Sequence, residues 1–193
     1  MAEPLRIGEE DALILVDVQV DFCRGGALAV PGGDAVVPVL NRLVERVRVV
    51  VATRDQHPAN HCSFREQGGL WPPHCVIGTP GAAYHPDLAV DKACVHVRKA
   101  FLPDVESFDN FAGEPDLATE LRSRGIRRVL VGGLATDYCV LNTVLGALER
   151  GFEVIAVSDA MRAVDVNPGD GERAWEQMRA AGAVLATSEQ LLA

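Results

Sequence analysis

Apolar and polar positions repeat along the chain with two different periods. Short continuous apolar runs at residues 12–16, 48–53, 93–97, 128–131, 154–157 and 184–187 predict buried strands. Between them, residues 34–46, 116–124, 136–150 and 171–181 place apolar side chains every three or four positions, which predicts amphipathic helices. Gly125, Gly151 and Gly182 stand where three of these helices should end.

Apolar strands that alternate with helices predict a mostly parallel sheet covered on both faces. We therefore expect an α/β protein with three layers, α/β/α, a six-stranded doubly wound sheet and one domain over residues 1–193. Residues 54–91 are rich in proline and glycine and are predicted to form a long loop.

In this architecture ligands bind outside the carboxyl ends of the strands. Polar or reactive residues occupy nearly all of those positions, at Asp17, 54–57, Lys99, 133–139 and 158–159. The pattern therefore predicts a functional site along one edge of the sheet.

Composition restricts the classes of partner. The net charge is −9, which argues against nucleic acid or anionic membrane surfaces as partners but leaves small anionic ligands open. Five cysteines in a chain with strong apolar periodicity do not indicate a disulfide framework. We expect a reduced, cytoplasmic protein without a membrane segment, and the sequence leaves open whether it forms a homo-oligomer.

Asp17, Lys99 and Cys139 are candidates for nucleophilic chemistry. Each follows a predicted strand, and Lys99 is one of only two lysines in a chain that otherwise uses arginine. A thiol beside a carboxylate and an ammonium group forms a nucleophile with a proton acceptor. Taken singly, the carboxylate could instead cap a helix, the lysine could be solvated and the cysteine could be a core residue.

Cys139 has the strongest positional argument. The glycine pair 132–133 permits a sharp turn after the strand, and a helix is predicted to begin near residue 136. The first turn of a helix favours a thiolate, and its N–H groups could hold an oxyanion.

A second group consists of Asp55, His57 and His74, with His61 as a further candidate. Two histidines and one carboxylate suit zinc, iron or manganese and leave positions open for a ligand. The spacing is not a fixed motif, and His57 could instead begin a turn before Pro58.

Four residues near these candidates could form the wall of a pocket for a planar substrate. They are Phe22, Trp71, Leu134 and Tyr138.

Five segments occur in an order that resembles the nicotinamidases of the isochorismatase-like cysteine hydrolases: DVQVDF (17–22), TRDQHPANHCSF (53–64), WPPHCVIGTPGA (71–82), RKAFLPDVESFDNF (98–111) and GLATDYCV (133–140). The third and fifth segments are the specific ones, and the likeness covers almost the whole chain.

The resemblance implies a catalytic triad of Asp17, Lys99 and Cys139. It implies one divalent metal on Asp55, His57 and His74, with His61 a ligand in some relatives. It also implies an oxyanion hole formed by the N–H groups of Ala135 and Cys139, and a cis peptide bond before Ala135.

Two residues depart from the family pattern. Val20 stands where asparagine is usual, and Ala100 stands where glycine usually follows the lysine. Neither is a triad or metal residue, so they bear on substrate and rate more than on the type of reaction.

The first hypothesis is an amidohydrolase that converts the small carboxamide nicotinamide, and also pyrazinamide, through a cysteine thioester. The second keeps this chemistry but has another heteroaromatic or aliphatic carboxamide as substrate, as the two departures suggest. The third is a domain that binds a dinucleotide or a partner without hydrolysis, although the turn after the first strand lacks GxGxxG.

Overall fold

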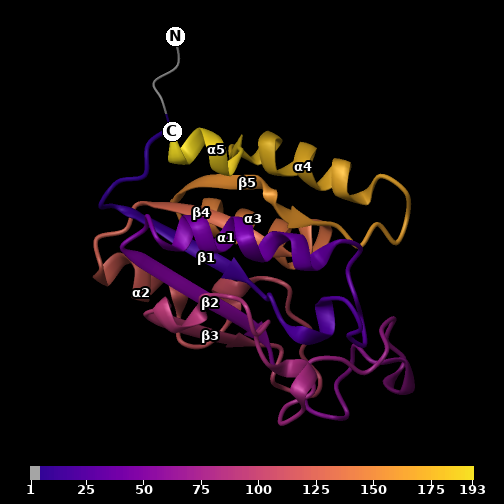
Figure 1. Ribbon diagram of the computed structural model, residues 1–193. Coiled ribbons are helices and arrows are strands. Elements are labelled where there is room, and N and C mark those ends of the chain that lie inside the picture. Colours follow the sequence, from indigo (N-terminus) through magenta and orange to yellow (C-terminus); the bar gives the residue numbers. More distant parts are fainter. Residues whose placement is uncertain (1–4) are drawn as a thin grey trace.

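The centre of the molecule is a six-stranded parallel sheet. A computed structural model describes residues 5–193. The strand order is β3-β2-β1-β4-β5-β6, and every neighbouring pair is parallel (Figure 1). The strands are β1 (Asp11–Val16), β2 (Val49–Asp55), β3 (Val95–Lys99), β4 (Arg128–Leu134), β5 (Glu153–Arg162) and β6 (Val184–Ala186).

Helices cover both faces of this sheet, so the predicted three-layer fold is confirmed. The helices are α1 (Val36–Val44), α2 (Leu117–Ser123), α3 (Leu141–Glu149), α4 (Asp170–Ala181) and α5 (Ser188–Leu192). The side chains of α1 and α5 enter one apolar core, and those of α2, α3 and α4 enter the other. Within residues 5–193, no helix is long and apolar enough to cross a bilayer.

The sequence pattern placed the elements correctly but misjudged several ends. β2 continues through Asp55 and β5 continues to Arg162, beyond the apolar runs that predicted them. Hydrogen bonds to neighbouring strands keep these polar ends extended, which hydrophobic periodicity does not report. The predicted helix 136–150 begins with a π-helical turn, Thr136–Val140, before α3.

The short helix α5 was not predicted. Its start is marked by a capping box in which the side chain of Thr187 accepts from the N–H of Gln190, and the side chain of Gln190 accepts from the N–H of Thr187. The motif TSEQ is readable in the sequence, but five residues are too few to show helical periodicity.

The two central strands approach closely where they lead into the site. Gly133 of β4 has φ +133°, and a Cβ there would lie 2.1 Å from the carbonyl oxygen of Val16 in β1. Because that atom belongs to the backbone, it cannot move aside without displacing the strand. Only glycine therefore allows β1 and β4 to deliver Asp17 and Cys139 to the same edge.

Gly133→Ala is expected to destabilise the protein by at least about 3 kcal/mol, because the new Cβ meets backbone atoms. Gly125→Ala is the control, since φ there is +74° and no atom lies within 4 Å of an added Cβ. The control should cost about 1–2 kcal/mol. Urea unfolding measures both, and equal losses would contradict the close-approach argument.

Candidate active site

Asp17, Lys99 and Cys139 meet at the carboxyl edge of the sheet. Lys99 is the last residue of β3, Asp17 directly follows β1, and Cys139 lies in the π-helical turn after β4. The Lys99 Nζ atom lies 2.9 Å from Asp17 Oδ2 and 3.4 Å from Cys139 Sγ. Asp17 and Lys99 have no exposed surface, and Cys139 is 5% exposed. The structure thus brings together the three residues predicted from separate strand ends.

The carboxylate of Asp17 is held from two sides. Its Oδ1 accepts a hydrogen bond of 2.6 Å from Thr53 Oγ1, while its Oδ2 faces Lys99. Burial raises the pKa of Asp17, and the charge of Lys99 opposes this rise. A carboxyl group with a raised pKa is better able to accept and return a proton at neutral pH.

The same burial acts on the thiol. Desolvation raises the pKa of Cys139 well above its ordinary value, although the charge of Lys99 lowers it. The sequence led us to expect that a helix N-terminus and Lys99 would favour a thiolate; in the resting site burial outweighs the charge of Lys99, and the raised pKa favours the thiol. Burial by itself would lower the pKa of Lys99, but Asp17 and Asp55 raise it well above its ordinary value, so this lysine stays charged.

Asp55, His57 and His74 form a second group, with ligand atoms all within 4.8 Å of one another. The ring Nδ1 of His57 lies 3.0 Å from the carbonyl oxygen of His74, and that of His74 lies 2.8 Å from the carbonyl oxygen of Pro72. Because a carbonyl oxygen only accepts, each Nδ1 must carry the hydrogen. Both Nε2 atoms therefore carry no hydrogen, and each presents a lone pair.

These lone pairs fit a metal ion. His57 Nε2 is buried, has no hydrogen-bond partner among the described residues, and lies 3.9 Å from Asp55 Oδ2. Burial lowers the pKa of His57 to about 3 and also lowers that of His74, so both rings are neutral, as ligation requires. Backbone carbonyls that fix the ring tautomers are typical outer partners of metal-bound histidines.

His61 lies beside this group, but both of its ring nitrogens form hydrogen bonds within the protein. Its ring is 4.3 Å from that of His57, centroid to centroid. Its Nδ1 lies 2.7 Å from Ser63 Oγ, and its Nε2 lies 3.0 Å from the carbonyl oxygen of Val105. Both ring nitrogens are thus engaged by the protein, which distinguishes His61 from His57 and His74.

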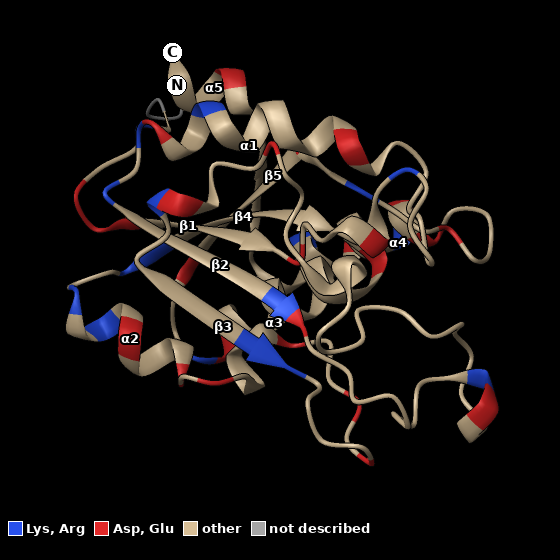
Figure 2. Cartoon of the chain, turned by 60° about the horizontal axis from the view of Figure 1, so that its bottom comes forward, with Lys and Arg blue, Asp and Glu red and all other residues tan. Residues whose placement is uncertain are grey.

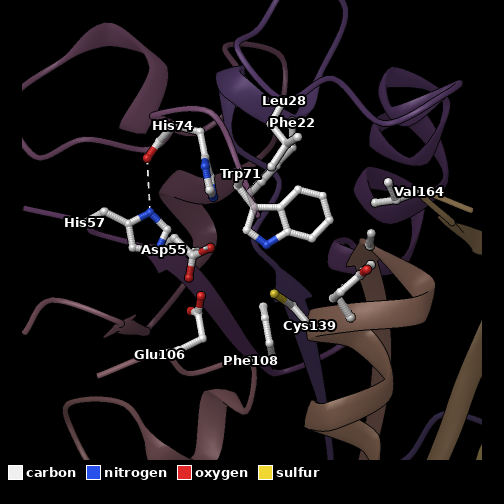
Figure 3. A pocket seen from close by; sticks show the side chains of 12 residues that line it. Phe22, Leu28, Asp55, His57, Trp71, His74, Glu106, Phe108, Cys139 and Val164 are labelled. Atoms are coloured by element: carbon white, nitrogen blue, oxygen red, sulfur yellow. Dashed lines mark hydrogen bonds and ion pairs between the residues drawn. The ribbon is translucent and has the colours of Figure 1, made fainter. Parts of the chain in front are cut away.

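A narrow cavity joins the two groups (Figure 3). Its volume, counted with the open mouth, is about 440 Å³. In Figure 3 the side chains of His74, Trp71 and Cys139 surround one space, and the sulfur of Cys139 points into it. The Trp71 and Tyr138 rings meet edge to face at 5.2 Å. The cavity can therefore hold a flat apolar ring over the thiol.

Leu134 does not line this cavity. Its side chain has no exposed surface and belongs to the core on the α1 face of the sheet. The next residue, Ala135, lines the cavity instead. A cis peptide bond joins the two, as the resemblance implied.

The structure adds lining residues that the sequence did not single out: Leu28, Glu106, Phe108 and Val164. Three of them are apolar residues in irregular segments, which carry no periodic signal. The carboxylate of Glu106 lies within 4.8 Å of ligand atoms of His57 and His61. Val20 and Ala100, the two departures from the family pattern, do not line the cavity.

Gln19 and Asp21 fix the backbone around the site through hydrogen bonds of their side chains. Gln19 is fully buried; its amide donates to the carbonyl oxygens of Asp55 and Ala82, and its oxygen accepts from the Asp55 N–H. The carboxylate of Asp21 accepts from the N–H groups of Cys75 and Ala27. The quoted segment DVQVDF contains both residues, but only the coordinates reveal their backbone partners.

A family model described as the isochorismatase domain matches residues 11–190. The chain is 42% identical to a nicotinamidase of Escherichia coli, over 91% of this chain and 94% of that protein. A pyrazinamidase of Pyrococcus horikoshii in complex with zinc has 46% identity and a TM-score of 0.85, covering 92% and 99% of the two chains. An L. infantum protein in complex with nicotinate has 38% identity and a TM-score of 0.91, covering 96% of each chain.

Gln19→Leu is expected to lower the free energy of unfolding by about 3 kcal/mol, because it leaves three buried backbone groups without partners. Gln67→Leu, at an exposed position in a short helix, is the control and should change it by less than about 0.5 kcal/mol. Urea denaturation compares the two. A similar small effect at both positions would show that Gln19 does not hold the strand ends.

Proposed function

This chain belongs to the isochorismatase domain family, and from that membership and the geometry of its site we propose that it is a nicotinamidase. It hydrolyses nicotinamide to nicotinate and ammonia, and pyrazinamide is expected to be a second substrate. The observation that carries the proposal is the thiol of Cys139. It contacts a buried lysine beside a buried carboxylate and opens into an aromatic pocket.

The first half of the reaction forms a thioester. Asp17 accepts the proton of the Cys139 thiol, and the sulfur attacks the amide carbonyl carbon. The carbon–nitrogen bond then breaks, and Asp17 returns the proton to the departing nitrogen, which leaves as ammonia. A carboxylate oxygen of Asp17 lies within 4.8 Å of the sulfur, so this transfer needs only a small side-chain movement.

The second half consumes water. Asp17 takes a proton from a water molecule while the oxygen of that water attacks the thioester carbonyl carbon. The carbon–sulfur bond then breaks and releases nicotinate. The proton then returns to the sulfur, which restores the resting thiol. Atoms balance: one amide and one water give one acid and one ammonia.

Lys99 stabilises the charges that move during these steps. When the thiol proton passes to Asp17, negative charge passes from the carboxylate to the sulfur. Both groups lie within 3.4 Å of the Lys99 ammonium nitrogen, so the negative charge stays beside this cation throughout the transfer. We assign the N–H groups of Ala135 and Cys139 to the substrate oxyanion, since both residues line the cavity.

Asp55, His57 and His74 are the residues that would hold a divalent metal, with zinc, iron and manganese all compatible with this ligand set. The bound metal would accept the pyridine nitrogen of the substrate and thereby fix the ring. The aromatic walls, Phe22, Trp71 and Tyr138, exclude water and hold the ring flat.

Release of ammonia from nicotinamide by the purified protein tests the proposed function directly. Nicotinamide and pyrazinamide should both be hydrolysed, with kcat/KM values well above that for an aliphatic amide such as propionamide, because the pocket selects a planar ring. A preference for the aliphatic amide would favour a different carboxamide as substrate. Absence of ammonia from all three would contradict the proposal.

Cys139→Ala is expected to lower kcat by about 10⁴-fold or more, because no other group can form the thioester. Cys94→Ala removes an exposed thiol and should leave turnover unchanged. Mass spectrometry of the quenched wild-type reaction should detect an acyl group on Cys139. Appreciable ammonia release by Cys139→Ala would rule out the covalent route.

One equivalent of Zn²⁺ is expected to bind per chain, and His57→Ala should reduce that stoichiometry below one-half. His96→Ala is the matched control, because that histidine is exposed, lies outside the cavity and belongs to none of the groups of possible metal ligands among the described residues. Metal content measured after dialysis checks this without using activity. Full retention of zinc by His57→Ala would show that the metal binds elsewhere.

A further inference from the structure

The last residues of β2 and β3 have a second face, opposite the active site. Arg54 is the register partner of Arg98, and Asp55 is the register partner of Lys99. Since successive residues of a strand point to opposite faces, the two arginines lie on the reverse side of the catalytic pair. Both guanidinium groups are thus on the face that also carries His96, which is exposed.

Within residues 5–193, none of the helices covers this part of the sheet. Helix α1 contacts β1, β4 and β5. Along β3, buried and exposed side chains alternate, and His96 and Arg98 are the exposed ones. Figure 2 shows basic residues on the ends of both strands without a helix over them. A groove of about 770 Å³, counted with its open side, is lined by Arg54, His96, Val97, Arg98, Glu114 and Pro115.

The guanidinium groups are poorly matched by acids of the chain. Arg54 is half-buried and, among the described residues, has neither an ion pair nor a side-chain hydrogen bond; it packs over the Tyr84 ring at 5.4 Å. Arg98 packs over Phe101 at 4.6 Å and pairs with the exposed Glu114 at 3.1 Å. Aromatic packing therefore fixes both arginines while leaving most of their N–H donors unused.

Two like charges on register partners repel each other, and this repulsion is greatest without a counter-ion. The groove has two arginines and one carboxylate, so it is locally positive in a chain with a net charge of −9. Planar guanidinium groups hold phosphate oxygens through paired hydrogen bonds. We propose that this groove binds the phosphate group of a small molecule, between Arg54 and Arg98 and behind the active site.

Calorimetric titration of the metal-containing protein with inorganic phosphate and with AMP tests the proposal. Saturable binding of one anion per chain is expected, at about millimolar concentration or tighter. Arg54→Gln and Arg98→Gln should each weaken it about tenfold or more. Arg46→Gln, an exposed arginine beyond α1, is the matched control and should leave it unchanged.

Glu114→Gln supplies a change of opposite sign. Removing this carboxylate frees Arg98, so phosphate should bind about two- to fivefold more tightly. Equal affinity for inorganic phosphate and AMP would show that the groove recognises the phosphate group alone. Tighter binding of AMP would show that the ligand is a phosphorylated metabolite. Thermal unfolding of each variant verifies that it is folded.

Two results would overturn the proposal. One is the absence of saturable binding by the wild-type protein. The other is binding that survives both arginine substitutions, because the anion would then be at Asp55, His57 and His74 or elsewhere.

Discussion

A lysine ammonium group without any exposed surface must be surrounded by negative charge, and this requirement organises the molecule. Lys99 forms ion pairs with Asp17 and Asp55, which come from the ends of two different strands. An unpaired buried charge would lower the free energy of unfolding by several kcal/mol, so the ends of β1, β2 and β3 must keep the arrangement that pairs these charges. The parallel order β3-β2-β1 is what allows these residues to meet.

The same arrangement joins the two halves of the site. One carboxylate oxygen of Asp55 pairs with Lys99, and the other faces the bare Nε2 of His57. The carboxylate thus belongs both to the charge network of the thiol and to the group that fits a metal. Gln19 makes two hydrogen bonds with the backbone of Asp55 and donates a third to the carbonyl oxygen of Ala82, so the shared residue Asp55 has little freedom to move.

Much of this was readable in the sequence, for identifiable reasons. Apolar runs fix the strands, and parallel strands place their carboxyl ends at one edge, so Asp17, Lys99 and Cys139 could be brought together without coordinates. The tautomers of His57 and His74 could not, because they depend on loop carbonyls. The wall formed by Leu28, Phe108 and Val164 was also inaccessible, because these residues lie in irregular segments without a periodic signature. Leu134 was wrongly included, since it is the last residue of β4 and its side chain packs in the same core as Leu130.

The contacts of His61 have a consequence for the shape of the cavity beside the thiol. Its Nε2 engages the carbonyl oxygen of Val105, and the neighbouring Cys62 N–H donates to the carbonyl oxygen of Pro103. The segment beyond them carries Glu106 and Phe108, two walls of the cavity. The hydrogen bond between His61 and Val105 thus holds the segment that supplies these two walls, so it helps to set the width of the cavity beside the thiol.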